Sequence, residues 1–139
     1  MEMAIFSETS VYAELTISRD DFDPYALTQI LNIQPTAIYK KGEPAKYGSN
    51  RILTFNSWVL KTPEEESSDI DIQMDKLIQL IGKQISMLQT LKHESPQYEL
   101  RVCIVIYSKN NLLPGMLLST RHINFLNKIG ADIDFDIYF

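Results

Sequence analysis

The sequence is poor in the residues that build covalent or metal frameworks, with one cysteine, Cys103, and two histidines, His93 and His122. A single cysteine cannot close an internal disulfide, and the chain has no Cys/His spacing that holds a structural zinc ion. Cys103 lies within the apolar run RVCIVIY, so we expect it to be an inert core residue. We therefore predict no cofactor and no structural metal.

Long apolar runs are also missing. No stretch approaches the roughly 18 consecutive apolar residues of a membrane span. The first residues, MEMAIFSETS, lack the basic segment and the following apolar run of a secretory leader. These absences predict a soluble, cytoplasmic protein without a membrane partner.

Positive charge is in short supply, since 13 lysines and arginines stand against 18 aspartates and glutamates, for a formal net charge of -5. Affinity for phosphate backbones comes mainly from basic side chains that displace counterions, so we expect no nucleic-acid partner. The same excess of acid would steer encounter with a basic protein surface.

Catalytic sequence motifs are missing as well. The chain contains no G-x-S-x-G, no H-E-x-x-H and no dinucleotide-binding fingerprint. His93 follows Lys92 and fits a helix C-terminus, whereas His122 is expected on the surface in the first turn of another helix. The sequence leans away from an enzyme and leaves that question open.

What is present indicates a single α+β domain over residues 1–139, since a chain of this length with 45% apolar residues can build one core. Apolar and polar residues alternate in VYAELTIS, which predicts a strand over residues 11–17 with one buried face. Asp23 and Pro24 predict the start of a short helix, because aspartate caps free backbone amides and proline lacks one. That helix should end near Asn32, ahead of a helix-breaking proline.

Two further strands are predicted over residues 36–40 and 52–62 from their β-branched and aromatic content. After a polar connection, Ser68 is expected to cap one long helix that continues to His93, because apolar residues recur there at helical spacing. Gly82 lies on the apolar face of that helix. We attribute this glycine to a close approach between the helix and the sheet.

The last third of the chain predicts a strand, a helix and a strand. YELRVCIVIYS is apolar on both sides at its centre, as expected of a central strand. Ser119 begins a helix with Ile123, Leu126 and Ile129 on its apolar side, and Gly130 closes it in a left-handed cap. The whole order is βαββαβ followed by αβ, which favours a two-layer α+β sandwich with a ferredoxin-like core and an added αβ unit.

The closing segment GADIDFDIYF carries an aspartate at every second position. In a strand, Asp132, Asp134 and Asp136 lie on one face together with Tyr138, and the apolar residues between them lie on the other. The glycine-centred turn of a calcium loop is absent, and neighbouring carboxylates on one face lie about 7 Å apart. We therefore predict a solvated or partner-facing strand, and a metal site only if another strand contributes ligands.

Two other charged segments allow two readings each. Asp20 and Asp21 favour the positive end of the first helix, or they join the terminal aspartates in one acidic patch. The segment KKGEPAKYGSNR is either a solvated hairpin loop or an anion-binding or partner-binding loop, although it lacks the spacing of a phosphate-cradling motif. Its basic residues are Lys40, Lys41, Lys46 and Arg51.

One face of the predicted sheet collects aromatic and charged side chains. If the helices cover the other face, this one carries the terminal aspartates together with Tyr12, Glu14, Thr16, Arg101 and Tyr107, with Trp58 as a further candidate. Such a composition is typical of protein interfaces, where aromatics and arginine supply binding energy and acids steer a basic partner. The alternative is that the third predicted helix, a loop or a second subunit covers this face. The predicted partner-binding residues are Asp132, Asp134, Asp136, Tyr138, Trp58, Arg101 and Tyr107.

Four segments carry a resemblance to a known family: YAELTISRDDFDPYALTQILNIQPT, KKGE, SWVLKT and LSTRHINFLNKIGADIDFDIY. Together they resemble the bacterial proteins that carry domain of unknown function 4279. The most specific feature is the DFDP helix start combined with the terminal IDFDIY. The resemblance spans nearly the whole chain and implies a compact α+β domain, with no activity to transfer.

From these observations we predict a protein-binding module. Its sharpest form is immunity-type inhibition of a bacterial toxin, since some small acidic bacterial proteins act in that way. The alternative is small-ligand sensing or metal-dependent hydrolysis at the acidic terminal strand. The partner, the ligand and the oligomeric state are left open by the sequence.

Overall fold

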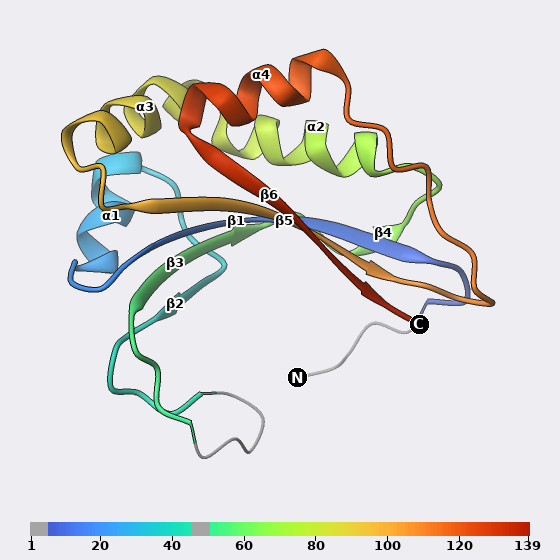
Figure 1. Cartoon of the computed structure of the whole chain (residues 1–139), viewed down its shortest axis with the longest axis horizontal. Coiled ribbons are helices and arrows are strands. Elements are labelled where there is room, and N and C mark those ends of the chain that lie inside the picture. The colour runs from blue at the N-terminus through green and yellow to red at the C-terminus, as the bar shows by residue number, and fades with distance from the viewer. Residues whose placement is uncertain (1–5, 46–50) are drawn as a thin grey trace.

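The computed structural model describes residues 6–45 and 51–139, which form a mixed α+β fold around one six-stranded sheet (Figure 1). The strands are β1 (Ser10–Arg19), β2 (Ala37–Tyr39), β3 (Asn56–Lys61), β4 (Glu65–Glu66), β5 (Glu99–Tyr107) and β6 (Ala131–Tyr138). The helices are α1 (Pro24–Leu31), α2 (Ile70–Ile81), α3 (Ile85–Glu94) and α4 (Thr120–Ile129), with a short 3-10 helix, η1 (Gly82–Gln84), between α2 and α3. The predicted α+β class is confirmed.

β1 lies in the middle of the sheet, whose strand order is β2-β3-β1-β5-β6, with β4 paired to one end of β1. β1 runs antiparallel to β3, β4 and β5, whereas β6 runs parallel to β5. A parallel pair needs a crossover connection, and α4 supplies it between β5 and β6. All the predicted strands are present, although β2 and β3 are shorter than predicted and β4 lies in the segment predicted as a polar connection.

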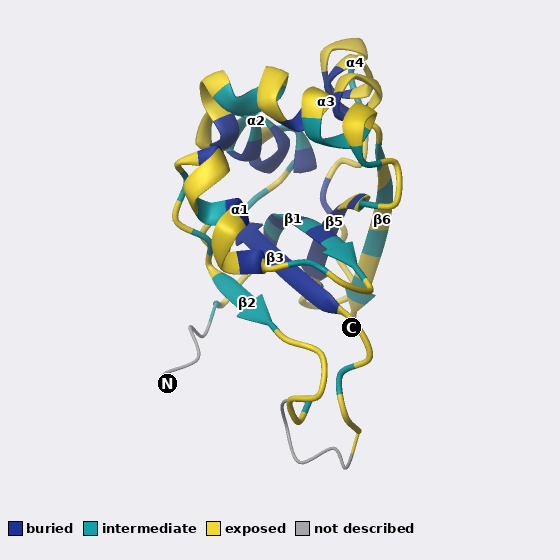
Figure 2. Cartoon of the chain, turned by 90° about the vertical axis from the view of Figure 1, so that its left-hand side faces the viewer, coloured by how far each residue is buried: buried dark blue, intermediate teal, exposed yellow. Residues whose placement is uncertain are grey.

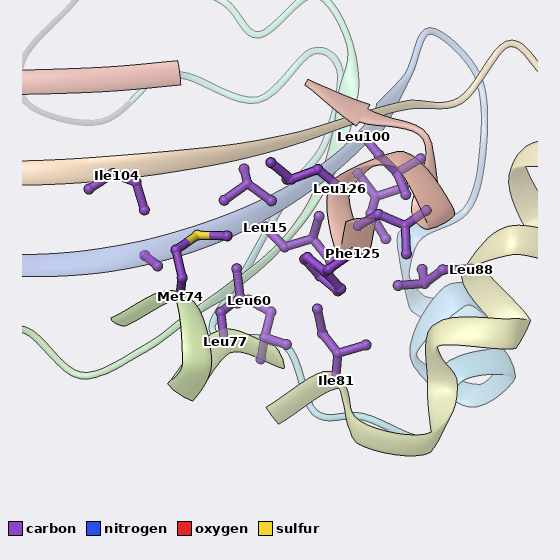
Figure 3. Packing of buried hydrophobic residues seen from close by; sticks show 14 of the residues in the cluster. Leu15, Leu60, Met74, Leu77, Ile81, Leu88, Leu100, Ile104, Phe125 and Leu126 are labelled. Carbon is purple, nitrogen blue, oxygen red and sulfur yellow. The ribbon is translucent and has the colours of Figure 1, made fainter. Parts of the chain in front are cut away.

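The helices form a second layer. α2, α3 and α4 lie over one face of the sheet, and α1 packs beside β2 and β3 (Figure 1). The buried residues of the helices turn toward the strands (Figure 2). In the core between the layers, Met74, Leu77 and Ile81 of α2 gather with Leu15 of β1 and Leu60 of β3 (Figure 3). No helix in residues 6–45 or 51–139 has the length and apolar character needed to cross a membrane.

The single long helix predicted from Ser68 to His93 is wrong, because the chain breaks the helix at Gly82. Gly82 has a φ of +55° and a ψ of -123°, a conformation that residues with a side chain rarely adopt. A Cβ atom there would meet nothing within 4 Å, so backbone freedom explains this glycine and a close approach to the sheet does not. The cap is also one residue later than predicted, since Asp69 accepts the backbone N–H of Asp71.

The other helix ends follow the predictions. The Asp23 carboxylate accepts a hydrogen bond from the backbone N–H of Tyr25 at 3.0 Å, and Pro24 occupies the first turn of α1. α1 ends at Asn32, which is left-handed with a φ of +52°. α4 ends at Gly130 with a φ of +68°. Gly130 places the chain directly into β6, which starts at the next residue.

Candidate functional site

The open face of the sheet is the side opposite the helices (Figure 1). The terminal aspartates lie on it, because the residues that alternate with them pack against the core. β6 alternates over its whole length, with Asp132, Asp134 and Asp136 exposed. The residues between them are partly buried and pack against the core: Ile133, Phe135 and Ile137. The predicted strand, apolar toward the helices and acidic toward the outside, is therefore confirmed.

β5 places its own side chains beside the aspartates, because the two strands run in parallel register. Arg101 lies opposite Asp132, and Tyr107 lies opposite Tyr138. The two tyrosine rings stack with their centroids 5.1 Å apart and an angle of 19° between their planes, within the range of favourable aromatic pairs. The structure thus brings these four residues onto one surface, as the sequence predicts.

Trp58 is not on the open face, and its placement among the partner-binding residues is wrong. β3 pairs Trp58 with Ile17 of β1 and Ile38 of β2, and residues paired across a sheet share a face. The Trp58 side chain has 0% exposed surface, and its Nε1–H donates to Thr28 Oγ1 at 3.0 Å. Trp58 therefore ties α1 to β3 on the helix side and cannot contact a partner.

The middle of the open face is formed by β1, where Tyr12, Glu14 and Thr16 are half-buried. Lys61 Nζ lies 4.8 Å from the centre of the Tyr12 ring, and Thr16 Oγ1 lies 3.4 Å from the Glu14 carboxylate. Burial raises the pKa of the Glu14 carboxyl, while Lys61 and Thr16 oppose that rise. Burial, followed by the charge of Glu14, also raises the pKa of Tyr12. Tyr12 is therefore a neutral phenol, and Glu14 is a partly desolvated carboxyl beside one lysine.

A hollow of about 500 Å³ opens on this face, walled by β1, β5, β6 and Phe55 of the β2–β3 loop. Its acidic side chains are Glu14, Glu99 and the three terminal aspartates, and its basic ones are Lys92 and Arg101. Acid therefore outnumbers base in the wall. The third predicted helix, α4, lies on the other side of the sheet (Figure 1), so it does not cover this face.

Cys103 is buried as predicted, but it lies under the aspartates of the open face and not in the core against the helices. Its Sγ atom is 3.5 Å from Asp136 Oδ2. Burial, and then the charge of Asp136, raises the pKa of the thiol to about 12. One carboxylate oxygen each of Asp134 and Asp136 lies within 4.8 Å of Sγ and of the other. β5 therefore adds a third potential ligand to the two aspartates of β6, which is the condition that the sequence analysis set for a metal site.

We expect native Cys103 to react with iodoacetamide at least about tenfold more slowly than an ordinary thiol at the same pH, because a pKa raised to about 12 removes most of the thiolate and the higher nucleophilicity of the remainder offsets only part of that loss. Mass spectrometry of timed samples measures the rate. The chain unfolded in urea is the control and should react at the ordinary rate. Equal rates in the native and unfolded chains would show that the thiol is neither buried nor held by Asp136.

His122 forms a second charged cluster, between α4 and α2, and its predicted surface position is wrong. The ring has 0% exposed surface. Its Nε2 lies 2.8 Å from Asp75 Oδ1, and its Nδ1 lies 3.0 Å from Ser119 Oγ and 3.2 Å from Asp71 Oδ1. Arg121 adds hydrogen bonds to both carboxylates. The cluster therefore joins the N-terminal turn of α4 to the first two turns of α2.

Serine, histidine and aspartate side chains in contact are the types that hydrolases use for nucleophilic catalysis. Here the imidazole has no exposed surface, so it cannot contact a substrate directly. Asp71 Oδ1 is buried and lies 3.2 Å from Nδ1 of the ring. This geometry favours a polar clamp between two helices over a catalytic group.

Sequence reasoning missed this cluster because it placed Ile123 on the apolar stripe of α4, beside Leu126 and Ile129, and left His122 on the surface. His122 shares its stripe with Phe125, Leu126 and Ile129, all buried, whereas Ile123 is 53% exposed. Spacings of three, four and seven residues from His122 were the available signal. The i and i+4 spacing of the two aspartates on α2 was a second one.

The remaining charged segments lie apart from the terminal aspartates. Lys40 and Lys41 are exposed near the start of the β2–β3 connection, and Pro44 bridges Ile52 across it, so the described part is a hairpin as predicted. Lys46 lies outside the described residues. Asp20 and Asp21 line a separate hollow of about 360 Å³, which shares Ser18, Phe55 and Glu99 with the larger one. The two acidic groups therefore adjoin without forming one site.

Comparison with known proteins identifies the family. The family model that matches the chain is described as Domain of unknown function (DUF4279), and the match covers residues 8–139. The chain therefore belongs to this family, which confirms the resemblance seen in the sequence. No curated protein and no solved structure matches the chain.

Proposed function

We propose that this member of the DUF4279 family is a protein-binding module whose open face takes a basic surface of its partner. The observation that supports it most directly is the row of Asp132, Asp134 and Asp136, exposed on one face of β6. The sharpest version of the proposal is an immunity-type protein that binds and blocks a bacterial toxin.

The composition of the surface around the aspartates supports the proposal. Tyr138 and Tyr107 form a stacked pair with 52% and 38% of their surfaces exposed, and Arg101 lies on the same face toward the other end of β5, opposite Asp132. Tyrosine and arginine are enriched among residues that dominate binding energy, because they bury a large area at low entropic cost. Surrounding acids raise the association rate with a cationic partner. The open face thus has both an aromatic anchor and a charged rim.

We further propose that the sheet has a ferredoxin-like core. The strand order β2-β3-β1-β5 with antiparallel neighbours, and helical connections after β1 and before β5, supports this arrangement. β6 then extends the core by one parallel strand through α4. The extension matters for function because it is the strand that carries the aspartates.

Replacing Asp132, Asp134 and Asp136 together with asparagine is expected to leave folding intact and to weaken partner capture at least about tenfold, because rim charges steer and hold a basic partner. Capture uses immobilised protein and a lysate of the source organism, with the thermal midpoint as the folding control. A matched variant removes three exposed acids elsewhere, Asp21→Asn, Glu43→Gln and Glu94→Gln, and should capture normally. If both variants lose capture equally, the effect comes from the net charge of the protein and not from the terminal aspartates.

The toxin version is tested on the captured protein itself. A photo-crosslinking amino acid at Tyr138 should attach to the same partner, whereas one at the exposed Ile72 of α2 should not. The partner should stop growth when expressed alone and permit growth when it is expressed with this chain. If the partner is harmless when expressed alone, the immunity-type version of the proposal is wrong and the protein-binding version stands.

A second candidate function is binding of a divalent cation, or of a small ligand through one, at the acidic strand. The cluster of Cys103, Asp134 and Asp136 within 4.8 Å favours it. A thiolate with two carboxylates suits zinc better than calcium or magnesium. Zinc should then raise the thermal midpoint of the wild type and not that of Cys103→Ser or Asp134→Asn. A rise that persists in both variants would place the ion elsewhere.

A further inference from the structure

β6 forms one edge of the sheet, and its backbone shows which of its groups face outward. The Tyr138 carbonyl accepts the backbone N–H of Ser108 at 2.7 Å, so Tyr138 turns its backbone groups toward the β5 side. The N–H of Phe135 instead donates to the Asp134 carboxylate at 2.9 Å. Because backbone groups of alternate residues point to opposite edges, Ile133, Phe135 and Ile137 present theirs at the outer edge. Among the described strands, none pairs with that edge.

The core is also incomplete at this edge. The helix-facing residues of the neighbouring strand β5 are almost fully buried: Leu100, Val102, Ile104 and Ile106. The corresponding residues of β6 remain partly exposed, although they pack against the core: Ile133, Phe135 and Ile137. A further strand beside β6 would cover them if its residues on that side were apolar. The opposite edge, β2, offers only three residues.

The aspartates of β6 disfavour a second copy of this chain as the added strand and favour a basic segment of a partner. Two copies of β6 paired edge to edge would set two rows of aspartates side by side on one face, and like charges on neighbouring strands destabilise a sheet. A strand with lysine or arginine on that face would instead place a cation beside each of Asp132, Asp134 and Asp136. Exposed edges take up extended segments in this manner in many peptide-recognition domains.

We propose that the outer edge of β6 binds an extended segment of a partner, with basic residues at alternate positions and apolar residues between them. This rests on the proposed function and names its binding mode. The basic side chains meet the aspartates on the open face, and the apolar ones cover Ile133, Phe135 and Ile137 on the helix side. The backbone of the segment pairs with the free edge, and the Asp134 carboxylate releases the N–H of Phe135.

The test uses dye-labelled synthetic peptides and fluorescence anisotropy. A peptide that alternates lysine with valine and isoleucine should bind at least about tenfold more tightly than one with glutamate in place of lysine. A peptide of the same composition, with its lysines in one block and its apolar residues in another, should also bind about tenfold more weakly. The Asp132→Asn, Asp134→Asn, Asp136→Asn variant should lose the preference for lysine over glutamate.

Methylation of the peptide nitrogens tests backbone pairing without changing the protein. In antiparallel pairing the apolar residues of the peptide share hydrogen bonds with β6, and in parallel pairing its lysines do so. Methylation of one set should therefore abolish binding while methylation of the other is tolerated. If the block peptide binds as well as the alternating one, or if neither methylation weakens binding, strand addition is wrong. Partner capture by the open face is measured separately and would stand in that case.

Discussion

Replacing Trp58 with alanine is expected to lower the free energy of unfolding by about 3–5 kcal/mol, the cost of removing a large aromatic side chain from a packed core. Trp58 has no exposed surface, and its indole N–H is held by Thr28. The variant loses the buried indole contacts, opens a cavity and leaves the Thr28 hydroxyl without its donor. Urea unfolding followed by circular dichroism measures the loss.

Tyr138→Ala is the matched control, because it truncates an aromatic side chain that is 52% exposed at the other side of the sheet. Its effect on stability should stay within about 1 kcal/mol, since it loses one exposed ring contact and little buried area. The two variants should also differ in partner capture. Tyr138→Ala should fold normally and capture the partner more weakly than the wild type. A stable Trp58→Ala protein would contradict the burial on which the correction of the site rests.

The contrast between β6 and β3 shows how far the sequence predicts a site. In IDFDIY, charge and apolar residues alternate strictly, and only one assignment of faces keeps the carboxylates out of the core. In NSWVLK, Asn56 and Ser57 are buried together with the apolar residues that follow them. Asn56 is buried because its amide donates to the Phe22 carbonyl and its Oδ1 accepts the N–H of Lys41. Lys61 is the one exposed residue of β3, and its spacing of three residues from Trp58 was the only period-two signal that placed Trp58 on the helix-facing side.

The break at Gly82 and the cluster around His122 were hidden for a different reason. A helix tolerates an occasional glycine, so the composition of residues 70–94 is compatible with one helix or with two. The direction of α3 depends on how it packs, which local sequence does not contain. His122 is buried only because Asp71 and Asp75 of another helix meet its ring nitrogens. The spacing of His122 along α4 indicates which face of the helix it occupies, but local sequence does not show that two carboxylates of another helix meet the ring there.

His122→Ala is expected to lower the free energy of unfolding by about 2–4 kcal/mol, because it removes a fully buried ring and leaves buried carboxylate atoms without their partner. Ile123→Ala, at the next position, is the control and should cost about 1 kcal/mol or less, since that side chain is 53% exposed. His122→Leu separates packing from polarity. If leucine restores full stability, the carboxylates contribute nothing through the ring.

Lowering the pH tests how much of the stability that the His122 cluster contributes depends on the charge of Asp75. The hydrogen bond from Arg121, and then that from His122, holds the pKa of this carboxyl below its ordinary value. A carboxyl with a lowered native pKa stabilises the fold above its pKa in the unfolded chain, about 3.9, and loses that contribution as the pH falls through the native value. Asp75→Asn should therefore cost up to about 1 kcal/mol at neutral pH, since the side chain is 42% exposed, and progressively less in acid. Urea unfolding of both proteins across this range gives the difference, and a cost that does not change with pH would show that the charge of Asp75 is not what joins α4 to α2.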